Sequence, residues 1–338
     1  DRPADGDADG KTFLTWLQSK PEFARALMLS GPLPAEPDKM LRVAAAIHKE
    51  DPSGLANRHE LTTAAAVALT FGQPGWPEDQ AIVRYMYFRD SRLAGLLHPV
   101  FESLETWEKR YVVSAGSNGG HGGWDDASLV WLRDHVKLPI DAYIDACWQA
   151  PYRLENAFGD SIHGADYYAP FGHMIHAQRV RDVGGVCGSL SHYGATAARA
   201  NGIPAITMGE PGHCAYAVRL ARGQWTPAYS LSWQRGLHTS LWGSTWTQLV
   251  LQDRALADQA AHDQCVLALW EARAAREGDP AVASAAYRRA LAAQPIHLPA
   301  WKEAIGYFKG LESMDAPAWI ALRDQAMFEL LYSSGLRL

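Results

Sequence analysis

Residues 184–220 read GGVCGSLSHYGATAARANGIPAITMGEPGHCAYAVRL. Two glycines precede Cys187, and an alanine-rich stretch follows it as far as Asn201-Gly202. Alanine favours helix and an Asn-Gly pair is a common helix end, so we predict a helix over residues 187–200. The runs IPAITMG, HCAYAVRL and QWTPAYSLSW then predict three strands, with a hairpin turn at ARGQ between the last two.

This helix and the strands after it carry a possible thiol-imidazole pair. A helix beginning at Cys187 stabilises a thiolate through its unpaired N–H groups and its dipole. Gly184 and Gly185 allow a tight turn and close approach to a substrate. His213 begins a predicted strand and is a candidate to accept the thiol proton, whereas Cys214 is expected to point the opposite way and to serve packing. The alternative for Cys187 is ordinary core packing, because cysteine is among the most buried residue types.

The order of these features resembles the transglutaminase-like superfamily. The matching segments are GGVCGSLSHYGATAARANGIPA and GHCAYAVRL, within residues 180–235. The resemblance implies a papain-like α+β core in which Cys187 is the nucleophile and His213 the general base, with no cofactor. Members of the superfamily include protein cross-linking enzymes, peptidases and enzymes that strip N-glycans from asparagine, and some members lack catalysis.

The sequence departs from the superfamily at the third catalytic position. Members usually carry an Asp on the strand after the histidine, just past a Trp. Here that stretch is QWTPAYSLSW, with Tyr229 or Ser230 in the place of the acid. An imidazole without its carboxylate loses tautomer control, which lowers rates by orders of magnitude. Asp160, Asp166 and Asp182 are candidates to replace the acid, as is a Gln or Tyr side chain.

A polar and aromatic segment, residues 151–185, lies directly before the candidate nucleophile and lacks regular periodicity. Long irregular segments in compact domains often assemble sites. We predict a substrate-binding wall made of Trp148, Asn156, Asp160, His163, Asp166, Tyr167, Tyr168 and Gln178. The alternative is that these side chains cap turns and satisfy loop backbone. The HxxH spacing of His173 and His176 lacks a third ligand at a characteristic offset, so no metal site is predicted.

The whole chain is expected to have an α+β fold with helical lobes on either side of the core. Residues 1–10 form a polar linker, and residues 11–110 a helical N-terminal lobe with apolar residues three and four apart. Residues 111–250 form the transglutaminase-like core. Residues 251–338 form a helical C-terminal lobe, in which EGDPAVASAAYRRALAAQPIHLPAW resembles part of a tetratricopeptide hairpin.

Within the core, RYVVS (residues 110–114) predicts a short strand, and helices are expected over residues 126–136 and 140–149. The loop AGSNGGHGGWDD follows RYVVS and lacks both a GxGxxG context and a GK[ST] ending. It therefore does not predict a phosphate-binding loop.

Composition narrows the classes of function. The chain has 338 residues, 48% of them hydrophobic and 20% charged, and a net charge of −6. It has no basic run of the kind that binds nucleic acid, and no apolar stretch near the ~18 residues that span a bilayer. The four scattered cysteines predict neither a disulfide framework nor structural zinc. The polar start, DRPADGDADG, leaves export to a periplasm or the outside open.

The first expectation is a thiol-dependent hydrolase or acyltransferase that acts on amide bonds of peptides or glycopeptides. A second is a glycoside-cleaving enzyme on the same scaffold, with Asp160 and one of Glu155, Asp166 or Asp182 as its acid and base, ~5–10 Å apart. Such an enzyme would take a glycan as its substrate. A third is a catalytically inactive module that binds a protein partner through its helical lobes.

Overall fold

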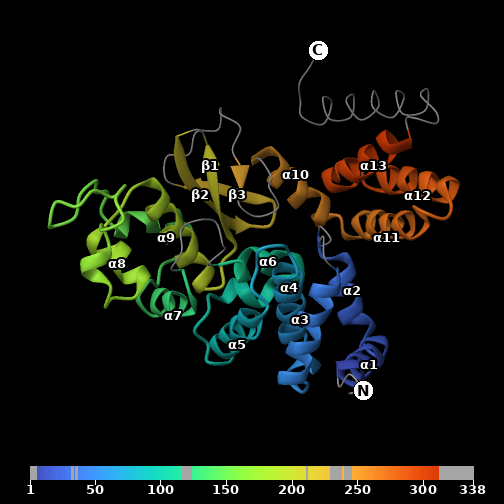
Figure 1. Cartoon of the computed structure of the whole chain (residues 1–338), viewed down its shortest axis with the longest axis horizontal. Coiled ribbons are helices and arrows are strands. Elements are labelled where there is room, and N and C mark those ends of the chain that lie inside the picture. The colour runs from blue at the N-terminus through green and yellow to red at the C-terminus, as the bar shows by residue number, and fades with distance from the viewer. Residues whose placement is uncertain are drawn as a thin grey trace, which may run out of the picture. The chain divides into compact units, whose positions relative to one another are not determined.

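The structure is a computed structural model that describes residues 6–31, 34, 37–115, 124–210, 212–228, 238–239 and 246–311. The chain divides into two compact units, Asp1–Trp246 and Thr247–Leu338. Most described residues are helical, and one small antiparallel sheet lies in the first unit (Figure 1). The coarse expectation of an α+β protein is thus confirmed. The first unit contains both the predicted N-terminal lobe and the predicted core.

The N-terminal half of the first unit is a set of helices around α4 (Arg58–Phe71) (Figure 1). Every residue from Glu60 to Phe71 is buried, because small alanines and threonines allow neighbouring helices to approach from several sides. The other helices here are α1 (Gly6–Gln18), α2 (Pro21–Leu29), α3 (Pro37–Glu50), η1 (Gly54–Ala56), α5 (Asp79–Leu93), η2 (Pro99–Ser103) and α6 (Thr106–Val113). α1 begins inside the stretch expected to be a linker.

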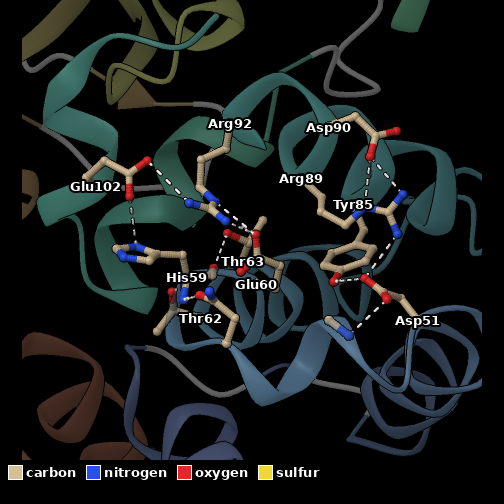
Figure 2. Close-up of polar contacts among 12 residues, drawn as sticks. Asp51, His59, Glu60, Thr62, Thr63, Tyr85, Arg89, Asp90, Arg92 and Glu102 are labelled. Carbon is tan, nitrogen blue, oxygen red and sulfur yellow. Dashed lines mark hydrogen bonds and ion pairs between the residues drawn. The ribbon is translucent and has the colours of Figure 1, made fainter. Parts of the chain in front are cut away.

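Polar side chains join the helices of this half to one another (Figure 2). The hydroxyl of Tyr85 donates to Asp51 Oδ2 at 2.8 Å, and Arg89 Nη1 lies 3.0 Å from the same oxygen. Arg92 binds the buried carboxylate of Glu60 and lies 3.6 Å from Glu102. Asp51 and Glu60 are buried, and these contacts give each carboxylate a positively charged partner, so we assign them a structural role.

The expected strand at RYVVS is wrong, because these residues belong to the end of α6 and the turn after it. A capping box starts this helix: the backbone N–H of Glu105 donates to Glu108 Oε2 at 2.6 Å. Tyr111, Val112 and Val113 are buried in the last turn. β-branched residues are tolerated here because tertiary burial outweighs their weak preference against helix.

The sheet has the order β3-β2-β1-β4, with β1 (Ala205–Glu210), β2 (His213–Ala221), β3 (Gln224–Ala228) and β4 (His238–Thr239). The first two predicted strands are confirmed as β1 and β2, and the third is confirmed over residues 224–228, since residues 229–233 of that run lie outside the described residues. β2 and β3 form the predicted hairpin, in which Ala221 pairs with Gln224 and Gly223 takes a left-handed φ of 74° in the turn.

The helix predicted at residues 187–200 is confirmed as α9 (Cys187–Ala200), which packs on β1 and β2. At Gly194 a Cβ would lie 2.5 Å from Cζ of Tyr216 on β2, so glycine is needed for this close approach. Around α9 lie α7 (Asp126–His135), η3 (Ile140–Gln149), η4 (Ala169–Phe171) and α8 (His176–Val183). The segment expected as a helix at residues 140–149 is a 3₁₀-helix, η3.

The second unit contains all but the first residue of α10 (Trp246–Ala257), together with α11 (Gln259–Ala275), α12 (Pro280–Ala293) and α13 (Leu298–Leu311). α11 and α12 pack side by side, and Tyr287 and Trp301 belong to the shared apolar core. Asp279 caps α12 by accepting from the backbone of Val282 at 3.0 Å, with Pro280 at the first helical position. In the described ranges, no helix is long and apolar enough to cross a membrane.

Candidate functional site

Cys187 is the first residue of α9. The preceding residue, Val186, takes the N-cap position with an extended backbone, φ −106° and ψ −171°, and makes no side-chain cap hydrogen bond. A valine side chain has no acceptor, so it leaves the first N–H groups of the helix for another acceptor. The side chain of Cys187 is partly exposed. The site thus has a sulfur at the positive end of a helix dipole.

The other three cysteines lie in environments that disfavour a thiolate. Burial raises the pKa of Cys147 to about 12, that of Cys265 to about 12 and that of Cys214 to about 11. Cys147 and Cys265 are fully buried. These thiols stay protonated at neutral pH and are poor nucleophiles there.

The start of β2 lies against the first two turns of α9. Ser191, one turn after Cys187, donates from Oγ to the carbonyl oxygen of Cys214 at 2.8 Å. After burial, a smaller cause of the raised pKa of Cys214 is the nearby charge of Cys187. Residues four apart share one face of a helix, so Cys187 and Ser191 both face this part of the sheet. Cys214 therefore belongs to the surroundings of the candidate nucleophile.

His213 is the first residue of β2, pairs with Glu210 and is partly exposed. Its position one residue before Cys214 brings it to the same end of α9 as Cys187. Neighbouring residues of a strand face opposite sides, so His213 is out of phase with Cys214, whose thiol interacts with Ser191 on α9. The location of both residues at the same end of α9 favours a Cys187–His213 pair. The alternation of side chains along β2, however, counts against direct contact between the His213 ring and the Cys187 thiol.

The two glycines before the helix are held by hydrogen bonds from both sides. The hydroxyl of Tyr168 donates to the carbonyl oxygen of Gly184 at 2.7 Å, and Gly185 N–H donates to the carbonyl of Pro151 at 3.1 Å. Arg153 N–H in turn donates to the carbonyl of Gly185 at 2.9 Å. Gly184 takes a left-handed φ of 91°. The backbone leading into Cys187 is therefore fixed by the irregular segment.

Asn156 and Asp160 of the predicted substrate-binding wall stabilise their own loop. Asn156 Nδ2 donates to Asp160 Oδ2 and to the carbonyl of Tyr167, each at 2.9 Å. Its Oδ1 accepts from the backbone N–H groups of Phe158 and Asp160 at 2.8 and 3.0 Å. Tyr167 is buried, and its hydroxyl lies 3.4 Å from the carbonyl oxygen of Val183. All the hydrogen-bonding groups of Asn156 are thus used inside the protein.

The remaining members of the predicted wall belong to different elements. Trp148 is exposed on η3, which packs against α9. His163 and Asp166 are exposed on the loop, and Gln178 is half-buried on α8. Asp182 pairs with Arg181 at 2.7 Å. Tyr229 and Ser230, at the place of the missing acid, lie outside the described residues.

His176, the first residue of α8, belongs to an aromatic cluster. Its ring centroid lies 4.8 Å from that of Trp124 and 5.9 Å from that of Tyr168. Among the residues that the structure describes, no group of three or more His, Cys, Asp or Glu side chains is placed to hold a metal.

Sequence reasoning missed Ser191 and the place of Cys214. The i, i+4 spacing of Cys187 and Ser191 is the signal that could have found the first, because it predicts a shared helix face. The contact between Cys214 and α9 depends on how the strand is turned, which spacing alone leaves undecided. The hydrogen bonds of Tyr168 and Pro151 to the glycine turn are long-range contacts with no local signal.

Comparison with known proteins yields no match to this chain, either among family models, among curated proteins or among solved structures.

Proposed function

We propose that this protein is a thiol-dependent hydrolase or acyltransferase that acts on amide bonds of peptides or glycopeptides, with Cys187 as its nucleophile. The observation that carries the proposal is the placement of Cys187 at the uncapped start of α9, partly exposed, while burial raises the pKa of the other three thiols. Helix N–H groups stabilise a thiolate and then the oxyanion formed when it attacks a carbonyl.

His213 is the proposed general base, acting from the start of β2. In this mechanism the imidazole takes the thiol proton through one bridging water and returns it to the leaving amine, and water or a second amine releases the acyl group from sulfur. Its place beside Cys214 at the Cys187 end of α9 supports the role. The order of cysteine helix, Gly-Ile-Pro-Ala and Gly-His strand, similar to the transglutaminase-like superfamily, supports it independently.

The substrate class is inferred from exposed aromatic side chains of the segment that leads into the glycine turn. Tyr152, whose backbone is bridged to Gly185, is 53% exposed, and Phe158 on the same segment is 70% exposed. The ring of Phe158 lies 5.9 Å from that of Phe171. Exposed aromatic side chains bind the apolar faces of sugars and of bulky peptide side chains. They support a peptide or glycopeptide substrate over a small polar amide.

The test compares wild type with Cys187→Ala and with a control, Cys265→Ala, which removes a thiol from the other unit. Each protein is incubated with a mixture of tryptic peptides and N-glycopeptides, and mass spectrometry follows new termini, released glycans and cross-linked products. We expect product from wild type and the control and none from Cys187→Ala.

Cleavage that survives in Cys187→Ala would overturn the proposal. If that residual cleavage were then lost in Asp160→Asn, the chemistry would belong to carboxylates and the glycoside-cleaving alternative would stand. If wild type yields no product from any substrate class, the interaction-module alternative would replace the proposal.

A further inference from the structure

The backbone just before Cys187 is held by a side chain from a distant part of the loop. Of the two groups of the Gly184–Gly185 peptide, the carbonyl oxygen accepts from Tyr168 at 2.7 Å and the N–H donates to Pro151 at 3.1 Å. A peptide plane held at both ends has little freedom to rotate. It also leads directly to Val186 and Cys187, so its orientation sets where α9 begins.

Tyr168 fits tightly against this turn. A Cβ added at Gly185 would lie 3.0 Å from the hydroxyl oxygen of Tyr168 and 2.7 Å from Oγ of Ser189. The ring is held by Tyr167 at 4.7 Å and His176 at 5.9 Å, centroid to centroid. Burial raises the pKa of Tyr168 to about 12, so its hydroxyl stays protonated and able to donate at physiological pH. A phenolic donor in a fixed ring is therefore always available to the Gly184 carbonyl.

We infer that Tyr168 is a positioning residue for Cys187, which it holds at the start of α9 by fixing the Gly184–Gly185 peptide. This inference rests on the proposed role of Cys187 as nucleophile and gives Tyr168 a task different from substrate binding. The N–H groups of the first helical turn stabilise a thiolate only when they point at the sulfur. If the Gly184–Gly185 peptide rotated freely, the Cys187 thiol would take several orientations. In some of them the N–H groups of the first helical turn would not point at the sulfur.

The experiment measures alkylation of Cys187 by iodoacetamide at pH 7 and at pH 10, with peptide mapping by mass spectrometry, in the full-length reduced protein. Tyr168→Phe removes the hydroxyl and keeps the ring. Tyr193→Phe is the matched control, because the hydroxyl of this buried tyrosine of α9 donates to Gln149 Oε1 at 3.2 Å rather than to the glycine turn. Thermal unfolding of both variants shows whether they remain folded.

Loss of one hydrogen bond to the turn should lower the ratio of the pH 7 rate to the pH 10 rate about threefold or more in Tyr168→Phe. The control should keep the wild-type ratio. A loss of stability alone would not change this ratio, because the ratio reports the ionisation of the Cys187 thiol. An unchanged ratio in folded Tyr168→Phe would therefore overturn the inference. If Tyr168→Phe is unfolded in buffer alone, both proteins are labelled in sucrose, which favours the folded state, and an unchanged ratio there would overturn the inference equally. Slow alkylation of Cys187 in wild type itself would instead count against the proposed function.

Discussion

At the scale of single residues, the site depends on a glycine that any other residue would replace only at a cost in stability. Gly184 combines a left-handed φ of 91° with a close neighbour: a Cβ there would lie 2.4 Å from the carbonyl oxygen of Pro151. This glycine lies three residues before Cys187, where the helix begins. The reactivity of the thiol is therefore tied to a position that carries no reactive group itself.

Gly184→Ala should destabilise the protein by about 1–3 kcal/mol, because the added methyl meets both strain and a backbone clash. It should also slow the alkylation of Cys187 at pH 7, since the start of α9 must shift. Gly159→Ala is the control: φ there is 86°, but nothing lies within 4 Å of the added Cβ. Urea unfolding and iodoacetamide labelling measure both effects. Equal behaviour of the two variants would show that the clash with Pro151 is not important.

At the scale of elements, a buried ion pair joins α6 to β2. Arg219 Nη1 lies 2.6 Å from Glu108 Oε1, and the two side chains are 3% and 1% exposed. Arg222, in the turn after β2, reaches the same carboxylate at 3.2 Å. The guanidinium of Arg219 also lies 4.9 Å from the ring of Trp107. This connection fixes β2, and with it His213, relative to the N-terminal helices.

Glu108→Gln should lower the free energy of unfolding by about 3 kcal/mol, because it leaves the buried guanidinium of Arg219 without its counter-charge. Glu105→Gln is the matched control, since its partner Arg58, at 2.7 Å, is largely exposed. Exposed pairs contribute at most about 1 kcal/mol. Urea denaturation of both variants at pH 7 makes the comparison. A loss in Glu108→Gln no larger than in the control would contradict the structural importance of this pair.

How far sequence predicts structure depends on how local the signal is. The bounds of α9 follow from signals inside or beside it: the glycines before Cys187, the alanines and the Asn201-Gly202 end. The prediction of a strand at RYVVS is wrong because its valines favour a strand. The capping box that starts the helix lies before this stretch, and the elements that bury its side chains are distant in sequence. Cys187 and His213 could be chosen as candidate residues from their order and spacing in the sequence. The strand orientation that brings Cys214 to α9 could not, because it is set by packing between elements.

At the scale of the whole molecule, the second compact unit has buried titratable groups of its own, a pair of histidines. In the second unit, the rings of His262 and His297 lie 5.1 Å apart, and both side chains are buried. Burial, and then the neighbouring His262, lower the pKa of His297 from 6.5 to about 3. His297 Nδ1 accepts from the backbone of Ala300 at 3.1 Å, at the start of α13. The neutral ring is thus part of the fold of this unit.

The folded state of the second unit should lose stability in acid. Because the folded pKa of His297 lies below its ordinary value, its contribution is complete above pH 6.5 and is lost as pH falls toward about 3. The loss amounts to at most about 5 kcal/mol. His297→Asn keeps an acceptor for Ala300 and removes the titration. Urea unfolding between pH 7 and pH 4 should show a smaller decline in the variant than in wild type, and parallel declines would contradict this account.

The central claim is that Cys187 is a nucleophile activated by the start of α9 and by His213. The most direct measurement is the rate of Cys187 alkylation at pH 7 relative to pH 10, in wild type and in His213→Ala, with Cys214 followed in the same digest. The account predicts a high ratio in wild type, a ratio at least about tenfold lower without the imidazole, and little labelling of Cys214 at pH 7. Equal ratios in the two proteins, matching that of Cys187 in the urea-unfolded chain, would contradict it.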